Sequence, residues 1–410
     1  MKGSNGRIGI IREWKVPVDR RVAMTPKAAR RALAMHPELD LVVEPSPVRA
    51  FSDAEYEAAG VRLATDLSDR DLLIGVKEVP VEHLLEGKRY LIFSHTIKKQ
   101  PHNRKLMQAV VRKGITLIDH ELLTDSSGER VLAFGHWAGV VGAYNALRGW
   151  NLLRGGPELK AAQHCHDLAE LKHEVLKLVD RDALHIVMTG AGRVGQGALE
   201  MLEAADLRRT APADLMAGND PGPTVTVLGT GDLYHRSDSA PFDRSEFHRD
   251  PGGHSAGLLP YLHRATVYLA CHFWDPRGPK ILTHDDLRTP GLTLQLIADV
   301  SCDVDGPIDS TLRASTIDEP YYGYSPVTCG EVAFGTAGSI GVMAVDNLPC
   351  ALPRDASEAF AQDLLDRVLP ALLGEGDDAM IDRATIVEEG RLTARFSHLE
   401  DYAAEATNAH

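Results

Sequence analysis

A glycine-rich turn between an apolar strand pattern and a helix pattern constrains the fold more than any other feature of this 410-residue chain. The segment HIVMTGAGRVGQGALEML carries the spacing GxGxxG at Gly190, Gly192 and Gly195. The first glycine of such a motif permits the tight turn, the second lets the backbone approach a pyrophosphate, and the third lets helix and strand pack closely. An ordinary glycine turn is the alternative. The flanking strand and helix favour a dinucleotide-binding loop that also includes Arg193 and Val194.

Short β-branched runs alternate with helical patterns on both sides of this turn. Helices are predicted at 25–36, 53–60 and 102–114, and the strand patterns before the turn are RIGIIRE, DLVVEP, LLIGVKEV, RYLIFSH, ITLIDHE and RVLAFG. The strand patterns TVYLACHF and LTLQLIADVS follow the turn. Such alternation predicts parallel sheets flanked by helices, and the chain is long enough for two cores. The predicted fold class is therefore α/β, with two Rossmann-like domains and a cleft between them.

Two helix patterns, WAGVVGAYNALRGWNLL and KAAQHCHDLAELKHEVLKL, lie on either side of a Gly-Gly-Pro break at 155–157, so this stretch is interpreted as a hinge region. After residue 330 another apolar helix pattern, ASEAFAQDLLDRVLPALL, is expected to pack back on the first domain. The first domain is therefore predicted to be discontinuous, at 1–140 plus 331–410, and the dinucleotide-binding domain is predicted at 141–330.

Charge and cysteine content exclude several classes of protein. The 44 basic and 58 acidic residues give a formal charge of −14, which disfavours nucleic acid and anionic membranes as partners. Five scattered cysteines argue against a disulfide framework and for a reducing compartment. With no secretory signal pattern at MKGSNGRIGIIRE and no apolar run long enough to cross a bilayer, the sequence predicts a cytoplasmic location.

The choice between NADP(H) and NAD(H) depends on the residues after the helix that follows the glycine turn. A site for NAD usually places a carboxylate there for the ribose hydroxyls, whereas arginine accommodates a 2′-phosphate. This stretch reads AADLRRTAPAD, with Arg208 and Arg209 where the carboxylate is expected. The sequence therefore favours NADP(H). NAD(H) remains open, because both arginines could face solvent and Asp206 or Asp214 could reach a ribose.

Polar groups follow two predicted strands of the first domain. Lys77 and Glu78 end GVKEVP, and His95 lies in FSHTIKKQ. Ligands of open α/β sheets bind at the carboxyl ends of the strands, where a lysine and a histidine facing a nicotinamide could exchange protons with an amine and a carbonyl oxygen. The structural alternatives are a solvated strand-end lysine and a hydrogen-bonded histidine in a turn.

Arg21, in VDRRVAMTP, and Arg130, in GERVLAFG, are suited to forked binding of a substrate carboxylate, although surface salt bridges would explain them equally. The cluster His164-Cys165-His166 lacks further ligands at suitable spacing, so the sequence predicts no metal.

At these residues the chain resembles the family of lysine 2-oxoglutarate reductases and lysine-forming saccharopine dehydrogenases, which is related to alanine dehydrogenase and to transhydrogenase nucleotide-binding subunits. The resemblance spans nearly the whole chain and is most specific in SHTIKKQP and DNLPCALPRDASE. It looks closer to the reductase branch, usually NADP-linked, than to the NAD-linked fungal-type enzymes. Many members of that branch are fused to a saccharopine-cleaving enzyme, so the resemblance implies a separate protein as the partner of this chain.

The resemblance also implies roles for individual residues. Lys77 and His95 match the family's proton-transferring positions, and Arg21 and Arg130 match its carboxylate-binding positions. Five further residues match acidic positions of the family. Glu78 and Glu121 match positions that line the substrate site, and Asp299 and Asp303 match positions near cofactor and substrate. Asp19 matches a position at which the family usually has a longer carboxylate.

The expected reaction is the NADPH-dependent, reversible condensation of lysine with 2-oxoglutarate to saccharopine through an imine. An alanine dehydrogenase or another opine or amino-acid dehydrogenase is the alternative enzyme, and an NADP(H)-binding sensor subunit is the alternative without catalysis. The expected partners are small molecules. The sequence leaves the oligomeric state open, and a homo-oligomer is compatible with it.

Overall fold

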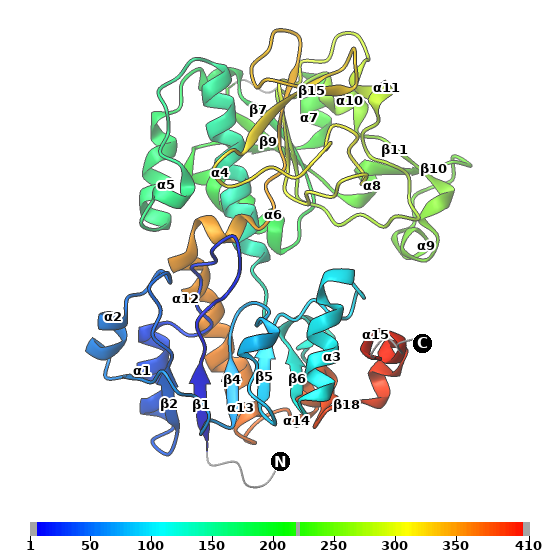
Figure 1. Cartoon of the computed structure of the whole chain (residues 1–410). Coiled ribbons are helices and arrows are strands. Elements are labelled where there is room, and N and C mark those ends of the chain that lie inside the picture. The colour runs from blue at the N-terminus through cyan, green and yellow to red at the C-terminus, as the bar shows by residue number, and fades with distance from the viewer. Residues whose placement is uncertain (1–5, 219–221, 405–410) are drawn as a thin grey trace. The chain divides into compact units, whose positions relative to one another are not determined.

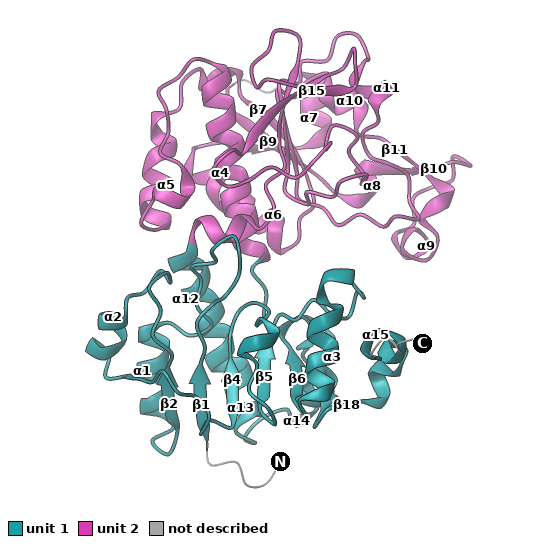
Figure 2. Ribbon diagram, in the orientation of Figure 1, with its two compact units in different colours: residues 1–134, 353–410 teal, residues 135–352 magenta. Residues whose placement is uncertain are grey.

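The computed structural model describes residues 6–218 and 222–404, and its contacts divide the chain into two compact units. Unit 1 comprises residues 1–134 and 353–410, and unit 2 comprises residues 135–352 (Figure 2). The first domain is thus discontinuous, as the sequence predicted. The predicted boundaries were 140 and 330, and the predicted first domain includes residues 1–5 and 405–410, which lie outside the described residues.

Unit 1 is an eight-stranded sheet in the order β18-β17-β6-β5-β4-β1-β2-β3, of which the strands from β6 to β3 are parallel (Figure 1). Its strands are β1 (Arg7–Ile10), β2 (Asp40–Val43), β3 (Arg62–Leu63), β4 (Leu72–Ile74), β5 (Arg89–Ile92), β6 (Thr116–Asp119), β17 (Thr385–Glu388) and β18 (Arg391–Leu392). The chain passes from β1 outward to β2 and β3 and then returns to β4 on the other side of β1. The gap between the ends of β1 and β4 is therefore the switch point at which ligands of such sheets bind.

Helices cover both faces of this sheet. Its helices are α1 (Pro26–Met35), α2 (Asp53–Ala58), α3 (Arg104–Arg112), α12 (Pro353–Asp363), α13 (Leu369–Leu372), α14 (Asp378–Ala384) and α15 (Glu400–Ala403). The buried side chains of α1, α12, α13 and α14 form one core with the sheet, and those of α3 and α15 form the other. Strands buried on both faces explain the nearly continuous apolar runs of the sequence.

Local signals set the first helix. The Thr25 side chain accepts a hydrogen bond from the backbone N–H of Ala28 at 3.2 Å, and Pro26 occupies the first helical position. A threonine cap followed by proline satisfies a free amide and sacrifices none. The first strand-to-helix connection is therefore fixed by residues close in sequence.

Unit 2 contains a second eight-stranded sheet in the order β15-β14-β16-β13-β12-β7-β9-β8, parallel from β16 to β8. Its strands, with the separate hairpin of β10 and β11, are β7 (His185–Thr189), β8 (Arg208–Thr210), β9 (Thr224–Leu228), β10 (Tyr234–Arg236), β11 (His254–Ala256), β12 (Val267–Ala270), β13 (Leu296–Asp299), β14 (Tyr321–Ser325), β15 (Gly330–Val332) and β16 (Ile340–Met343). Because β16 pairs with β13, and β14 with β16, the second unit extends to Leu352 and not to 330.

The helices of unit 2 are α4 (Gly135–Leu153), α5 (Leu168–Glu174), α6 (Arg193–Ala204), α7 (Pro212–Ala217), α8 (Thr230–Leu233), α9 (Arg244–Arg249), α10 (Leu259–Leu262) and α11 (His284–Leu287). α4 and α6 pack closely, because a Cβ at Gly139 would lie 1.8 Å from the Val194 carbonyl oxygen and one at Gly197 would lie 1.9 Å from the His136 carbonyl oxygen. This contact fixes the helix that begins at the glycine turn.

Two predicted elements were wrong. The run RVLAFG forms no strand. Val131 and Leu132 are buried in the core of unit 1 but do not join its sheet. The helix predicted from KAAQHCHDLAELKHEVLKL begins only after Asp167, whose carboxylate accepts the Glu170 amide and caps α5.

Candidate active site

Lys77, Glu78 and His95 lie at the carboxyl ends of two neighbouring parallel strands of unit 1. Lys77 and Glu78 follow β4, and His95 follows β5, which pairs with β4 in register. His95 adopts a φ of 52°, an uncommon conformation for a residue with a side chain. The turn that it makes keeps its ring at this edge of the sheet.

The Glu78 carboxylate lies between two basic groups. Its Oε2 is 3.3 Å from Nδ1 of His95, and its Oε1 accepts a hydrogen bond from Nζ of Lys15 at 2.7 Å. Burial raises the pKa of Glu78, but the hydrogen bonds from His95 and Lys15 outweigh burial and hold that pKa well below its ordinary value. Glu78 is therefore an ionised anchor that orients His95 by its contact with Nδ1 of the imidazole.

Glu121 and Arg130 form a second charged pair beyond β6. Nη2 of Arg130 lies 2.9 Å from Oε1 of Glu121, and Nε of Arg130 donates to the Glu121 carbonyl oxygen at 3.1 Å. Nζ of Lys98 lies 4.0 Å from the same carboxylate. The Arg130 side chain is 38% exposed, so part of its guanidinium can meet a ligand.

Arg21 has a different environment. Its side chain is only 2% exposed, and Nε and Nη2 donate to the two oxygens of Asp19 at 3.0 and 2.6 Å. The guanidinium also lies 4.2 Å from the centre of the Phe134 ring. Of the two predicted carboxylate-binding arginines, Arg130 is thus the accessible one, and Arg21 is the core of a buried ion pair.

Sequence reasoning missed Glu13 and Lys15, which follow β1. The Glu13 carboxylate accepts the backbone N–H groups of Val76 and Lys77 at 2.6 and 2.8 Å, and Lys15 holds Glu78. The sequence signal is the same as for Lys77 and Glu78, because Glu13 and Lys15 are also charged residues shortly after an apolar strand. Only the strand order shows that β1 ends beside β4.

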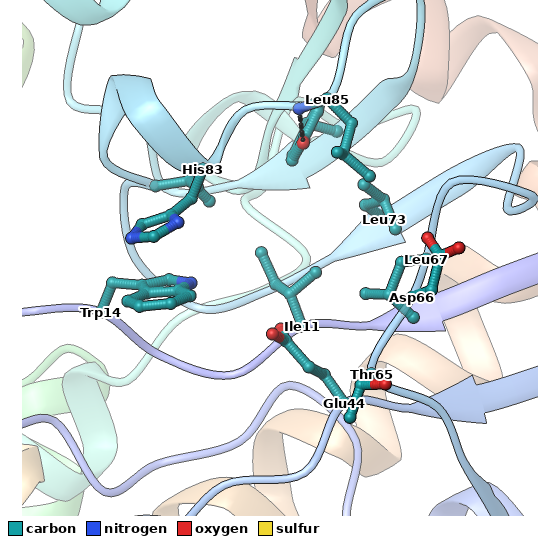
Figure 3. A pocket seen from close by; sticks show the side chains of 11 residues that line it. Ile11, Trp14, Glu44, Thr65, Asp66, Leu67, Leu73, His83 and Leu85 are labelled. Carbon is teal, nitrogen blue, oxygen red and sulfur yellow. Dashed lines mark hydrogen bonds between the residues drawn. The ribbon is translucent and has the colours of Figure 1, made fainter.

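A cavity of about 140 Å³ lies beside these residues, on the face of the sheet that α3 covers. Its apolar lining includes Ile11, directly after β1, Leu73 of β4 and Tyr90 of β5. Residues outside the strands complete the lining, among them Trp14, Glu44, Thr65, Asp66 and His83 (Figure 3). The rings of Trp14 and His83 stack with their centres 3.6 Å apart. This stacking is a second contact between the segments after β1 and β4, in addition to those of Glu13 and Lys15.

The glycine turn of unit 2 has the geometry of a dinucleotide-binding loop. Gly190 has a φ of 91°, and a Cβ there would lie 2.5 Å from the Cys271 carbonyl oxygen. A Cβ at Gly195 would lie 2.1 Å from the Gly190 carbonyl oxygen, whereas one at Gly192 would meet nothing within 4 Å. Gly192 caps α6, which has no side-chain cap and no acidic residue in its first turn, and Arg193 and Val194 begin the helix. The loop therefore leaves free space and amide donors where a pyrophosphate would bind.

Arg208 and Arg209 do not lie beside the glycine turn. Both are on β8, at the edge of the sheet, and β9 separates β8 from β7. The strand that pairs with β7 on this side is β9, which is followed by Gly229 and Asp232. Oδ2 of Asp232 accepts the Gly229 amide at 2.9 Å.

Asp299 ends β13 and is fully buried. Oδ1 accepts the Ser301 hydroxyl at 2.6 Å and the amides of Ser301 and Cys302, and Oδ2 accepts the Thr311 hydroxyl at 2.7 Å. Burial outweighs these bonds and raises the pKa of Asp299. Its carboxylate shapes the loop that follows β13, on which Asp303 is exposed.

One group of potential metal ligands lies among the described residues, at the opposite end of the unit 1 sheet. Nδ1 of His36 is 3.7 Å from Glu38 and 3.6 Å from Glu375. Nε2 of His36 is buried without a partner, whereas a metal-bound imidazole almost always donates from its second nitrogen. The group therefore does not fit a metal well. The absence of a metal at His164 and His166 stays a prediction.

Among residues 6–218 and 222–404, no helix has the length and apolar character needed to span a bilayer.

Residues 9–141 match the family described as "Alanine dehydrogenase/PNT, N-terminal domain". The chain is 30% identical to an alpha-aminoadipic semialdehyde synthase of Arabidopsis thaliana, over 97% of this chain and 42% of the relative. It is 28% identical to the mitochondrial alpha-aminoadipic semialdehyde synthase of Rattus norvegicus, over 93% and 46%. The chain thus spans less than half the length of these relatives. It is 28% identical to the saccharopine dehydrogenase [NAD(+), L-lysine-forming] of Neurospora crassa, over 80% of this chain and 82% of the relative.

Two solved structures have the same fold. An L-alanine dehydrogenase superposes with a TM-score of 0.64 at 18% identity, covering 97% of this chain and 99% of the other. A transhydrogenase from Sinorhizobium meliloti superposes with a TM-score of 0.58 at 15% identity, covering 94% and 98%. The relatives in sequence confirm the predicted resemblance to lysine-forming saccharopine dehydrogenases. The two solved structures confirm the predicted pair of Rossmann-like domains.

Proposed function

We propose that this chain is an oxidoreductase that condenses lysine reversibly with 2-oxoglutarate to saccharopine, through an imine and with a nicotinamide dinucleotide as hydride carrier. The observation that carries the proposal is the meeting of Lys77, Glu78 and His95 at the ends of β4 and β5. Homologues named saccharopine dehydrogenase support an activity on amino acids through saccharopine.

Formation of the imine needs proton transfers at one small locus. The lysine ε-ammonium must lose a proton before it adds to the keto carbon, and the adduct must then lose water. We assign these transfers to Lys77 and His95. Because Nδ1 of His95 faces Glu78, its exchange with a substrate would use Nε2. The bound dinucleotide would supply the hydride that reduces the imine.

The two carboxylates of 2-oxoglutarate need cationic partners. Arg130 is half-exposed and is the better placed of the two predicted arginines, with Glu121 fixing its orientation. Arg21 would act at this site together with Asp19, because the two side chains form one buried unit. Glu78 would keep the charge of the proton-transferring pair in balance.

The residues of the glycine turn fit a dinucleotide, with the pyrophosphate at Gly192 and the first turn of α6. The sequence favoured NADP(H) on the premise that Arg208 and Arg209 lie at the ribose position. We infer from the strand order that this position lies at the end of β9, where Asp232 offers a carboxylate. A carboxylate favours ribose hydroxyls over a 2′-phosphate. We therefore propose NAD(H) as the preferred cofactor, and the names of the fungal relatives agree with this choice.

An alanine dehydrogenase-like activity is the second candidate, because residues 9–141 match a domain family that bears that name. A spectrophotometric assay separates the candidates. Loss of NADH absorbance should require both lysine and 2-oxoglutarate, and pyruvate with ammonia should give none. Turnover with pyruvate and ammonia alone would replace the proposal by the second candidate. If the protein binds NADH but turns over neither lysine with 2-oxoglutarate nor pyruvate with ammonia, the result would favour a sensor subunit without catalysis. Repeating the assay with NADPH tests the cofactor choice.

The cytoplasmic location and a separate saccharopine-cleaving partner stay predictions.

A further inference from the structure

Three consecutive residues after β1 contact the segment on which Lys77 lies. The Glu13 carboxylate accepts the amides of Val76 and Lys77 at 2.6 and 2.8 Å, one on each oxygen. The Trp14 ring stacks on His83, and Lys15 binds the Glu78 side chain at 2.7 Å. We call residues 13–15 the clasp.

The clasp lies at the switch point of the unit 1 sheet. The Ile11 amide donates to the Ile74 carbonyl oxygen at 3.0 Å, which continues the pairing of β1 with β4 up to the clasp. Gly75 brings the two chains together, because a Cβ there would lie 2.7 Å from the Ile11 side chain. The backbone of 75–77 is therefore held against the continuation of β1.

The contacts of Glu13 stabilise the backbone of the residue that carries the proposed proton-transferring amine. The amides of Val76 and Lys77 lie beyond the last residue of β4, so they point toward Glu13 where strand pairing has ended. The Val76 carbonyl oxygen in turn accepts the Phe93 amide at 2.9 Å, which links the segment to the chain that leads to His95. A displacement at Glu13 would thus reach both Lys77 and His95.

We propose that Glu13 is the positioning residue for Lys77, because its two carboxylate oxygens fix the backbone of 76–77 at the edge of the sheet where the substrate reacts. This inference rests on the proposed function for the role of Lys77. The contact of Glu13 with the two amides is independent of the identity of the substrate.

The protonation state of Glu13 decides how both amides can be held. Burial raises the pKa of Glu13 to about 8, the two amide donors lower it, Asp19 raises it and Arg21 lowers it. The ionised carboxylate accepts from both amides, whereas the neutral carboxyl group and a glutamine each offer one carbonyl oxygen. The test is therefore made at pH 9, where the carboxylate is ionised.

The experiment compares Glu13→Gln with Glu55→Gln in the full chain. Glu55 lies in the first turn of α2 and accepts the Ser52 amide at 2.6 Å, so it makes the same kind of contact elsewhere in unit 1 without touching residues 76–78. We expect kcat with lysine, 2-oxoglutarate and NADH to fall about 10- to 100-fold in Glu13→Gln, the range for a misplaced catalytic group. Hydrogen exchange at Val76 and Lys77 should accelerate about tenfold or more. The Kd for NADH should stay within about twofold, and Glu55→Gln should keep kcat within about threefold.

Each other outcome has a defined meaning. Unchanged exchange at Val76 and Lys77 overturns the clasp, and faster exchange with unchanged kcat overturns its role in positioning Lys77. Equal losses of kcat in both variants also overturn it, because the effect would then be general. If Glu13→Gln does not fold, Glu13→Asp keeps the charge on a shorter side chain and must still show faster exchange. A wild-type protein inactive on these substrates refutes the proposed function, while the exchange measurement still decides the clasp.

Discussion

His95 and Glu78 follow different strands, yet Nδ1 of His95 lies 3.3 Å from Oε2 of Glu78. The pairing of β4 with β5 brings their ends to one edge of the sheet, and Lys15 occupies the other oxygen of the same carboxylate. One anion thus serves two basic groups, which explains why its pKa is lowered although its side chain is largely buried.

The lowered pKa of Glu78 predicts a pH-dependent contribution to stability. Its folded-state pKa lies below the ordinary value of 4.5, so the ionised carboxylate stabilises the fold above that pH and the contribution is lost as pH falls further. Wild type should exceed Glu78→Gln in free energy of unfolding at pH 7, and the difference should shrink between pH 5 and 3. Urea unfolding at several pH values measures it. Glu82→Gln, an exposed change on the same segment, is the control and should show no such trend.

Lys77→Met and His95→Gln should each reduce turnover of lysine and 2-oxoglutarate by about two to four orders of magnitude, as expected for lost acid-base catalysis. Thermal unfolding and NADH binding should stay close to wild type, because neither side chain belongs to the core or to unit 2. Unchanged turnover in both variants would refute the assignment.

The glycine turn offers a matched pair of substitutions. Gly192→Ala adds a methyl group to open space, so the free energy of unfolding should change by no more than about 1 kcal/mol while the Kd for the dinucleotide rises about tenfold or more. Gly195→Ala places its Cβ 2.1 Å from the Gly190 carbonyl oxygen and should destabilise unit 2 by about 2 kcal/mol or more. Calorimetry and cofactor titration measure both. Tight cofactor binding by Gly192→Ala would contradict a pyrophosphate at that glycine.

Arg130→Met should raise the KM for 2-oxoglutarate about tenfold or more, because it removes a half-exposed guanidinium proposed to bind a carboxylate. The KM for lysine should change much less. Steady-state kinetics with one substrate varied at a time gives both values. Arg20→Met removes an exposed arginine whose Nε donates to the Val48 carbonyl oxygen, and it should leave both KM values near wild type. An equal rise in both KM values for Arg130→Met would argue against a specific carboxylate contact.

Local patterns predicted much of the fold, because the signals lie within a few residues of each other. Thr25 and Pro26 start α1 as expected, and the glycine turn joins β7 to α6. The apolar pattern predicted a strand wrongly where residues are buried without pairing in a sheet. Val131 and Leu132 form an apolar run that packs in the core without joining the sheet.

The sequence indicated individual candidate residues, such as Lys77, Glu78 and His95, but not the contacts between them. Lys77 and His95 were recognised because charged groups directly after apolar strands are unusual. Their link through Glu78, and the attachment of Lys77 to Glu13, could not be predicted, because each contact joins segments far apart in sequence. The separation of Arg208 and Arg209 from β7 was not predictable for the same reason, since the two residues follow α6 in sequence but β9 lies between their strand and β7.

The sequence by itself determined the two series of strands and helices, the glycine turn and the chemical types available at the strand ends, because spacing and side-chain chemistry are properties of short segments. The tertiary structure alone decided which strand ends become neighbours, which charges are neutralised by partners and which arginine stays accessible. Those outcomes depend on the order of strands in each sheet, and hydrogen bonding between distant segments sets that order.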